Sequence, residues 1–413
     1  MNARRLIASI LTGAATAAIA VSAAPQDTPA PPAPAAVEVR VHVSAAGKFQ
    51  DDLKLGDFTL LEDGRPQKIS SLTLVNGGAI ARREDDGAGA PAAPGRTYTL
   101  LFQAVTWDPK FSGVIDYLFG SILKSGDAMT LITPFKPYQL QKDAIAAKSK
   151  AELSTGMEDV LRKDIARGSG EYRQLIADLR RLTRAISGNT AAFDEDLESD
   201  VTTESLGGMG VEMQIERYRT TLLRLDSIRL VDEAKLLAFA GALKAVRGQK
   251  TVVLFYEREY RPEISDASMN RLMAIYQENF DILLNLMDLF QLYKREKKFD
   301  AEKVTRAFSD AGIDFHFIFM EKKSQRVFGA KMQEQSEDVF PMFVKIAEAT
   351  GGTHETSQNP DATFKRAADA SNQYYLLSYV PDAYTPDGGF RSIEVKVGRP
   401  GCAVVNRLGY YAK

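Results

Sequence analysis

The hydrophobic and polar positions of the chain alternate in some segments and cluster in others, which predicts several strands. Valine occupies every second position from Val37 to Val43, and this period of two predicts a strand with one buried face. Residues 57–75 predict two strands joined at the turn sequence Glu62-Asp63-Gly64. Uninterrupted apolar runs are typical of strands buried on both faces, as in a parallel sheet. Such runs occupy residues 97–102, 251–256 and 313–320.

Helical segments are expected between these strands. Residues 111–123 and 340–349 predict helices, and the second should end at Gly351-Gly352, where a left-handed cap costs little. Residues 128–135 predict another strand. Strands that alternate with helices predict an α/β fold with a doubly wound, mostly parallel sheet. Short β segments are expected toward residue 413, at 374–380, 391–397 and 403–408.

Two long segments, about 141–248 and 262–305, have the pattern of helical insertions in this α/β domain. Their apolar residues are spaced alternately three and four apart, for example from Tyr172 to Ile186 and from Met269 to Phe290. Such a seam predicts helices that pack on one another, either as a bundle within the chain or as a coiled coil between chains. Charged residues within 268–293 disfavour a membrane span there. Insertions of this size are expected to carry the particular function of the protein.

The first residues have the layout of a secretory signal peptide. Arg4 and Arg5 precede an uncharged, mostly apolar stretch, and small residues follow at Val21-Ser22-Ala23. We therefore expect residues 1–23 to be a signal peptide that directs the protein to the periplasm or outside the cell. An uncleaved anchor is the alternative, but the apolar stretch is shorter than the ~20 residues that span a bilayer. The prolines within 24–36 predict an extended linker.

The remaining domain boundaries are predicted from shifts in composition. Residues 77–95 are rich in glycine, alanine, proline and charge, and we expect them to form a flexible linker. This linker would separate an N-terminal β segment, 37–76, from the α/β domain, 96–372. Residues 373–413 are expected to form a C-terminal β segment. The pattern therefore predicts one α/β domain flanked by two β segments.

Composition and charge narrow the function classes. Of the 413 residues, 45% are hydrophobic and 26% are charged, which excludes a disordered, collagenous or polytopic membrane protein. A net charge of −2 provides no basic field for nucleic acid or anionic lipid. The single cysteine, Cys402, excludes a disulfide within the chain and a zinc site built on cysteine pairs. With only three histidines, the chain favours binding over catalysis.

Several short segments, taken in order, carry a family resemblance: Asp57-Phe58, Glu62-Asp63-Gly64, Arg96 to Phe102, Ser125-Gly126-Asp127, Ile346 to Gly352, Tyr374 to Tyr379 and Arg407 to Tyr410. Together they resemble the von Willebrand factor A-related family, in its acidobacterial-type exported form. The resemblance covers about 37–140, 249–258 and 313–413, and leaves both helical insertions unmatched. It implies an A-domain core, a Rossmann-like, mostly parallel six-stranded sheet with helices on both faces. It also implies that the N- and C-terminal β segments pair into a small β-sandwich.

A-domains commonly bind partners through a metal-ion-dependent adhesion site, and the resemblance implies where it would lie. An Asp-x-Ser-x-Ser stretch ends the first strand, and the partner supplies a carboxylate to Mg²⁺ held by oxygen ligands. Here Gln103 stands where the aspartate is expected, and Val105 and Trp107 stand where the serines are expected. Glu257-Arg258 replaces the later acidic turn, and Arg258 would place positive charge near a cation. We therefore expect neither a metal ion nor another cofactor.

What remains of this edge is a candidate surface for a protein partner, since ligands of open α/β sheets bind at the carboxyl ends of the strands. Trp107 is either an exposed anchor for a partner or a core side chain that fills the space of the missing metal. A shifted register, Asp108-x-Lys110-x-Ser112, would restore one carboxylate but adds a lysine. The candidate edge consists of Gln103, Thr106, Trp107, Asp108, Glu257 and Arg258.

The sequence contains no recognisable catalytic constellation. His42 is expected to face solvent, His316 to be a hydrogen-bonded core residue and His354 to lie in a loop. There is no Gly-x-Ser-x-Gly elbow and no complete P-loop. The sequence therefore predicts an exported, non-enzymatic interaction, adhesion or scaffolding module that acts without metal. Its expected partners are proteins of the cell envelope or extracellular space, with no nucleic acid and no membrane span after cleavage. A metal-dependent adhesin with an unusual ligand set and a cell-envelope hydrolase are the alternatives.

Overall fold

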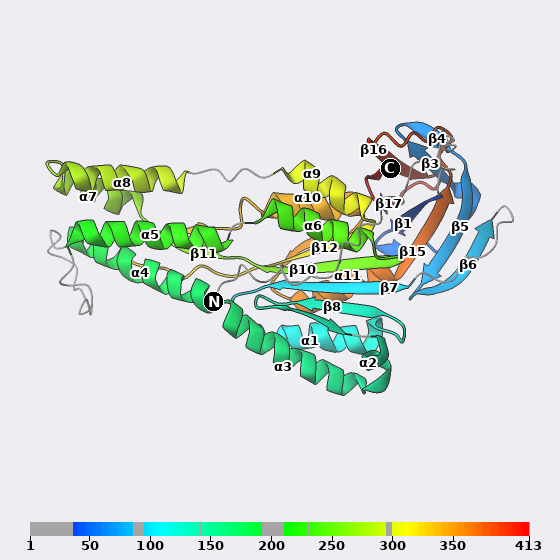
Figure 1. Cartoon of the computed structure of the whole chain (residues 1–413), viewed down its shortest axis with the longest axis horizontal. Coiled ribbons are helices and arrows are strands. Elements are labelled where there is room, and N and C mark those ends of the chain that lie inside the picture. The colour runs from blue at the N-terminus through cyan, green and yellow to red at the C-terminus, as the bar shows by residue number, and fades with distance from the viewer. Residues whose placement is uncertain are drawn as a thin grey trace, which may run out of the picture.

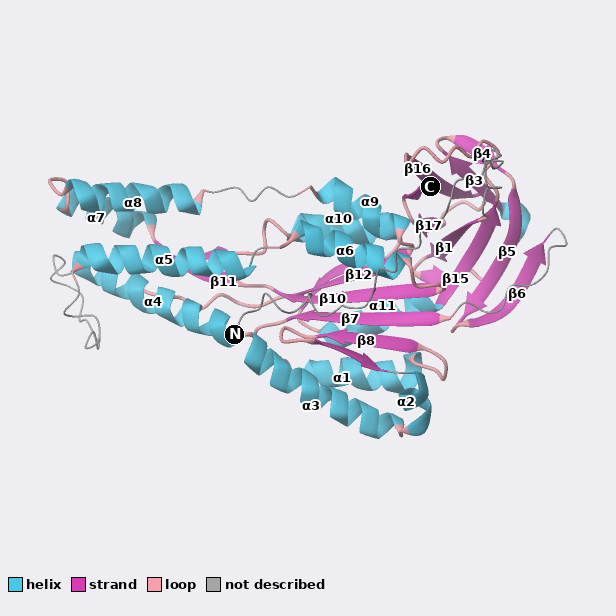
Figure 2. Cartoon of the chain, viewed as in Figure 1, coloured by secondary structure: helices cyan, strands magenta, loops and turns pink. Residues whose placement is uncertain are grey.

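The computed structural model describes residues 36–85, 95–140, 142–191, 210–229, 231–294 and 300–412. The signal peptide expected at 1–23 and all but the last residue of the linker expected at 24–36 lie outside the described residues. The described part is mixed α/β, and Figures 1 and 2 show a helical lobe at one end of the long axis, a sheet between helices in the middle and a β-sandwich at the other end. Within it, no helix has both the length and the apolar character needed to cross a bilayer.

The central sheet has six strands in the order β14 (His354–Ser357), β12 (Ile313–Met320), β10 (Gln249–Glu257), β7 (Arg96–Gln103), β8 (Ala128–Ile132) and β9 (Pro137–Leu140). All neighbours are parallel except β9, which runs antiparallel to β8. Every residue of β10 and β12 is buried, because helices cover both faces. This burial explains their uninterrupted apolar sequences, and the predicted strands are confirmed.

Helices pack on both faces of the central sheet, as Figure 1 shows. One face is covered by α1 (Lys110–Tyr117), α3 (Lys150–Gly168) and α11 (Pro360–Asn372), with the short α2 (Lys142–Ala147) before α3. The other face is covered by α6 (Glu233–Lys244), α9 (Ala301–Asp310) and α10 (Phe340–Thr350). Alternate residues of β10 point to the two layers, so Val253 and Phe255 join the first core and Val252 and Leu254 the second. As expected, α10 ends at Gly351, whose φ of 79° is left-handed.

The β-sandwich combines strands from both parts of the chain. Its larger sheet runs β17 (Ala403–Asn406), β1 (Val37–Ala45), β15 (Gln373–Tyr379), β5 (Ile69–Asn76) and β6 (Ala79–Asp85), with β2 (Lys48–Phe49) beside β1. The smaller sheet runs β18 (Gly409–Tyr411), β16 (Phe390–Val397), β3 (Phe58–Glu62) and β4 (Arg65–Gln67), and a 3-10 turn (Leu55–Asp57) precedes β3. Val39, Val41 and Val43 are fully buried between the sheets, as their alternation predicts. The predicted turn between β3 and β4 has positive φ at both Asp63 and Gly64.

The helical lobe consists of α4 (Gly170–Ala191), α5 (Val211–Arg229), α7 (Asp266–Ile275) and α8 (Phe280–Tyr293), which share one apolar core. A two-stranded ribbon, β11 (Tyr260–Ile264) with β13 (Ala330–Glu334), lies beside them, and α4 contacts both of its strands. The ribbon directly follows β10, so the lobe lies beyond the carboxyl end of the central sheet. The 3,4 spacing from Tyr172 to Ile186 therefore does correspond to a helix that packs within the chain. In α8 the predicted seam is wrong, because Phe280, Met287 and Phe290 are exposed. The buried residues of α8 are instead Ile282, Leu286 and Leu289.

The expected insertion at 141–248 needs correction, because its helices do not form one bundle. Leu153 and Leu161 of α3 pack against one face of the central sheet, and Leu243 of α6 packs against the other. Only α4 and α5 project into the lobe. The second expected insertion, 262–305, likewise includes the end of β11 and the start of α9. Apolar spacing marks the buried face of a helix but does not specify whether a sheet or another helix covers it.

The flexible linker expected at 77–95 is also wrong in part, because residues 79–85 form β6. The strand pairs with β5 after a turn in which Gly77 and Gly78 both have positive φ. It is an exposed edge strand, so its backbone hydrogen bonds form without the apolar side chains that the composition argument required. Residues 86–94 of the expected linker lie outside the described residues.

Candidate functional site

The carboxyl edge of the central sheet brings together two of the residues predicted for it. Glu257 ends β10, and its buried carboxylate accepts hydrogen bonds from the backbone N–H groups of Val105 (2.7 Å) and Thr106 (3.0 Å). The Thr106 hydroxyl donates to the other carboxylate oxygen at 2.6 Å. The loop after β7 is therefore fastened to the end of β10 by a single side chain.

A lysine that sequence reasoning missed completes this arrangement. The Lys322 ammonium, from the loop after β12, donates to the Glu257 carboxylate and lies 3.3 Å from the Thr106 hydroxyl. We call Glu257, Thr106, Lys322 and the two backbone amides the Glu257 clasp. No sequence signal identifies Lys322, because it comes from a loop and only the fold brings it to Glu257.

The Glu257 clasp has the chemistry of an ion pair, with little to offer a metal ion. Mg²⁺ requires about six oxygen ligands in octahedral geometry. The clasp offers the Glu257 carboxylate and the Thr106 hydroxyl, and the Lys322 ammonium already lies against both. In the part of the chain that is described, no three His, Cys, Asp or Glu side chains form a group able to hold a metal.

The other residues predicted at this edge have structural contacts of their own. Gln103 is half-buried at the end of β7, where it pairs with Tyr256 in the sheet. Asp108 accepts a hydrogen bond from the Lys110 backbone N–H at 2.9 Å, at the start of α1. Arg258 lies between two carboxylates, 3.4 Å from that of Glu321 and 3.3 Å from that of Glu334, and over the Phe319 ring.

Trp107 is half-buried and packs against the core between the sheet and α1. Its ring meets the Phe111 ring edge to face, with centroids 5.6 Å apart. Phe111 in turn meets Phe102 and Phe255 of the sheet. These contacts favour the core role of Trp107 over that of an exposed anchor.

The helical lobe is fixed to the ribbon by buried polar groups. The Arg261 guanidinium of β11 donates to Glu263 (2.8 Å) and to Asp226 of α5 (3.0 Å). The Tyr218 hydroxyl donates to the Pro262 carbonyl at 2.9 Å, and the Tyr293 hydroxyl of α8 donates to Tyr218 at 2.8 Å. Burial raises the pKa of Glu263 although Arg261 opposes the shift. This network holds α5 and α8 in fixed positions relative to β11 of the ribbon.

Helix α8 presents a second apolar stripe that the described residues of its lobe do not cover. Ile282, Leu286 and Leu289 face the lobe core and are buried. The opposite side carries Phe280, Leu284 and Met287, which are 75%, 48% and 60% exposed. Phe290, at the edge of the buried face, is 42% exposed. Phe280 lies two positions before buried Ile282, and Leu284 two positions before buried Leu286. Two positions correspond to about 200° around the helix. A helix that is apolar on all sides is normally buried.

Two of the three histidines have lowered pKa values inside the fold. His42, expected to face solvent, is instead half-buried: its Nδ1 lies 3.0 Å from the Gln373 carbonyl and its ring 5.1 Å from the Phe49 ring. The correction arises because Gln373 and the Phe49 ring lie against the imidazole. Burial lowers the pKa of His42. Burial and, secondarily, the charge of Arg40 lower the pKa of His316 to about 3.

His316 lies next to a serine hydroxyl, but the hydrogen-bond directions do not suit a catalytic pair. Its Nδ1 accepts from the Thr353 backbone N–H at 3.1 Å, which places the ring proton on Nε2. Nε2 therefore donates to the Ser371 hydroxyl at 2.6 Å, and that hydroxyl donates to the Ala367 carbonyl. A general base must accept the proton of its serine. His316 and Ser371 are also buried from any substrate.

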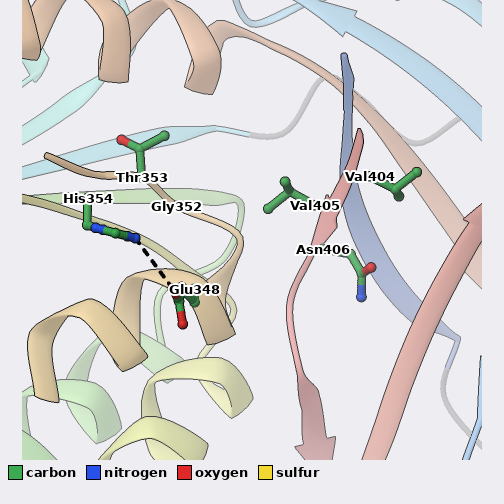
Figure 3. A pocket seen from close by; sticks show the side chains of 7 residues that line it. All are labelled: Glu348, Gly352, Thr353, His354, Val404, Val405 and Asn406. Carbon is green, nitrogen blue, oxygen red and sulfur yellow. Dashed lines mark ion pairs between the residues drawn. The ribbon is translucent and has the colours of Figure 1, made fainter. Parts of the chain in front are cut away.

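His354 lies in an open pocket of about 490 Å³ between α10, β14 and β17. Figure 3 shows its ring directed at Glu348, with Nε2 and the carboxylate 3.4 Å apart, and Val404, Val405 and Asn406 across the pocket. Thr353 is the only hydroxyl residue among those that line the pocket, and its hydroxyl group contacts His316. The pocket therefore has a histidine–carboxylate pair without a nucleophile.

Comparisons with known proteins leave the family of this chain open. No family model and no curated protein matches it. Among solved structures, the chain is similar to the human COPII-coat protein Sec24c, with 8% sequence identity and a TM-score of 0.25. The match covers 78% of this chain and 44% of that chain. A TM-score this low supports no argument about fold or function.

Proposed function

We propose that this protein is an exported protein-interaction or scaffolding module that binds a partner protein through the exposed apolar stripe of α8. In this proposal the central sheet is an A-domain core of the von Willebrand factor A type, and the partner belongs to the cell envelope or extracellular space. The observation that carries the proposal is the solvent-exposed stripe formed by Phe280, Leu284, Met287 and Phe290. Exposed apolar patches of this kind mark interaction sites in soluble proteins.

The chemistry around the stripe indicates what kind of partner would fit. Phe280, Leu284 and Met287 are spaced four and three apart, which matches the apolar face of a second helix. Glu278, Asp281 and Asp288 are exposed beside them. We therefore expect a partner helix whose apolar face is flanked by lysine or arginine, since opposite charges fix orientation and speed encounter.

The Glu257 clasp supports binding without metal. A divalent cation at this edge would have to displace the Lys322 ammonium from Glu257 and Thr106. The alternative, a metal-dependent adhesin, predicts saturable micromolar binding of Mg²⁺ or Mn²⁺ that is lost in Asp108→Ala. Calorimetric titration distinguishes the two, because our proposal predicts no saturable heat.

The hydrolase alternative has less support. In the tautomer in which His316 Nδ1 accepts from the Thr353 backbone N–H, the Nε2 proton points toward Ser371, so the ring is not placed to remove the hydroxyl proton. The pocket around His354 lacks a nucleophile. A broad screen of hydrolase substrates with the purified protein tests this alternative. Turnover abolished by a His316 or His354 substitution would favour it over the interaction module.

The test of the proposal compares two variants of the full chain. Leu284→Asp combined with Met287→Asp introduces charge into the stripe, whereas Val380→Asp introduces it at an exposed apolar residue of the β-sandwich. In affinity capture from envelope extract of the source organism, we expect the stripe variant to lose a partner that wild type and Val380→Asp both retain. An identical set of captured proteins from all three would contradict the proposal. Sedimentation velocity shows in addition whether the partner is a second copy of the chain.

A further inference from the structure

A pocket of about 620 Å³ lies at the amino edge of the central sheet, opposite the Glu257 clasp. Its walls come from the first residues of β10 and β12, from the ends of α6 and α9, and from β1, β15 and β18 of the sandwich. Figure 1 shows β10 and β12 approaching β1 and β15 there. The volume is in the range of small-molecule sites, which are common where two domains meet.

Two of the basic residues in this pocket are neutralised by carboxylates. Arg40 forms an ion pair with Asp314, and its guanidinium lies 4.2 Å from the centre of the Tyr374 ring. Lys244 forms an ion pair with Asp310 at 2.5 Å. Each of these aspartates therefore already has a cation as its ion-pair partner.

Lys250 and Arg407 form no ion pair of this kind with a described residue, and the Asp310 carboxylate offsets their charges only in part. Lys250 is only 8% exposed, and its side chain forms no hydrogen bond or ion pair with another described residue. Arg407 donates through Nη2 to the Glu38 carbonyl at 2.8 Å, but its buried Nε has no partner in the described part of the chain. Burial lowers the pKa of Arg407, and burial with the charges of Arg407 and Lys244 lowers that of Lys250 to about 8. Burying cations without counter-charges is costly.

The two cations converge on one point beside Gly312. A Cβ placed on this glycine would lie 3.5 Å from Arg407 Nη1 and 3.9 Å from Lys250 Nζ. Gly312 has a φ of 61°, which favours glycine, and it leaves the space between the two nitrogens open. A ligand oxygen near this point could accept hydrogen bonds from both side chains.

The remaining charges of the pocket leave it positive. Exposed Arg247 adds a third cation without an ion pair to a described residue, and exposed Glu38 is the remaining carboxylate. Tyr374, Tyr384 and Tyr411 supply ring surface around the cations. The pocket therefore combines an excess of positive charge with aromatic walls.

We propose that this pocket binds a small organic anion through a carboxylate or phosphate group held between Lys250 and Arg407. The guanidinium is suited to two oxygens of one group, and the ammonium adds a point charge. The tyrosines would cover the uncharged part of the ligand. The proposal is independent of partner binding at α8, which lies beyond the opposite edge of the sheet.

Calorimetry on the full chain tests the proposal, with inorganic phosphate and succinate as separate probes at low ionic strength. We expect saturable binding of at least one probe to wild type and to Lys396→Gln, a control on the exposed face of β16. Lys250→Gln and Arg407→Gln should each weaken that binding at least about tenfold. Phosphate alone or succinate alone would identify the acidic group. Absence of saturable binding by either probe, or unchanged affinity in Lys250→Gln, would overturn the proposal.

A second measurement covers the case in which these variants fail to fold. In wild type, the bound probe should slow acylation of Lys250 by an amine-reactive reagent at least severalfold, with the Lys396 rate unchanged, as followed by peptide mass spectrometry. Equal rates for Lys250 with and without probe would contradict the proposal. A merely structural Lys250 predicts that Lys250→Gln lowers the melting temperature. We expect the temperature to stay equal or rise, because the variant removes a buried charge that has no ion-pair partner and that Asp310 offsets only in part.

Discussion

Replacing Glu257 with alanine removes the side chain that fastens the loop after β7 to β10. The carboxylate accepts two backbone hydrogen bonds and one from the Thr106 hydroxyl, and pairs with Lys322. Val105 is buried, so its N–H would lose its partner, whereas water can reach exposed Thr106 and the half-exposed Lys322. We therefore expect Glu257→Ala to lower the free energy of unfolding by about 2–4 kcal/mol.

Two further variants separate the contributions of the backbone hydrogen bonds, the charge and the Lys322 ion pair to the stability of this loop. Glu257→Gln keeps one oxygen for the Val105 N–H but loses the charge, at a cost of about 1–2 kcal/mol. Lys322→Met removes only the partly exposed ion-pair partner and should cost less than about 1 kcal/mol.

Urea unfolding can be followed by the emission of Trp107, the only tryptophan, which lies in the same loop as Val105 and Thr106. The expected order of cost is Glu257→Ala, then Glu257→Gln, then Lys322→Met. If Lys322→Met costs as much as Glu257→Ala, the backbone hydrogen bonds do not hold the loop and the reasoning is wrong. If Mg²⁺ raises the urea concentration at the midpoint of unfolding, the folded protein binds the cation, which would argue against our interpretation of the Glu257 clasp as an ion pair.

Three other predictions follow from single contacts. The unfolding free energy should fall as pH drops below about 6.5, by up to about 1.4 kcal/mol per pH unit, because His316 binds a proton in the unfolded state that it does not bind in the folded state until about pH 3. In urea titrations at several pH values, His316→Gln should reduce this pH dependence. A pH dependence equal to that of wild type would refute the prediction. Leu284→Ala on the exposed side of α8 should change the free energy of unfolding by less than about 0.5 kcal/mol, whereas Leu286→Ala on the buried side should lower it by about 2–5 kcal/mol. If chemical denaturation gives similar losses for the two variants, the stripe is covered. Asp127→Ala should lower the free energy of unfolding by about 3–5 kcal/mol, because it leaves the buried Arg96 guanidinium without the carboxylate that lies 2.6 Å from it. A melting temperature equal to that of wild type would contradict this prediction.

Sequence patterns were sufficient to predict the structure of segments whose conformation is determined by local interactions. The valines of β1, the left-handed turn at Asp63-Gly64 and the cap at Gly351 were predicted, and the structure confirms them. In each case the structure depends on residues close together in the chain: the strand on side chains that alternate between its two faces, and the turn and the cap on residues that tolerate positive φ. The linker prediction at 79–85 was wrong because an exposed edge strand is held by the backbone of its neighbour, which composition does not register.

The candidate site was predicted only in part for the same reason. Glu257 and Thr106 were placed at one edge because the carboxyl ends of parallel strands meet there. Their direct hydrogen bond, and the ammonium of Lys322 beside them, depend on the paths of two loops. The role of the edge as a partner surface stays a prediction, and the exposed stripe of α8 now carries the proposed function.

The sequence by itself determined most of the strands and helices and where several turns fall, because these properties repeat with the period of the backbone. Tertiary structure decided which apolar face of α8 is covered, that α3 and α6 cover the sheet, and that Lys250 and Arg407 share one pocket. Contacts of this kind join side chains that are distant in the chain. They are set by how whole elements pack, and no local pattern of residues encodes them.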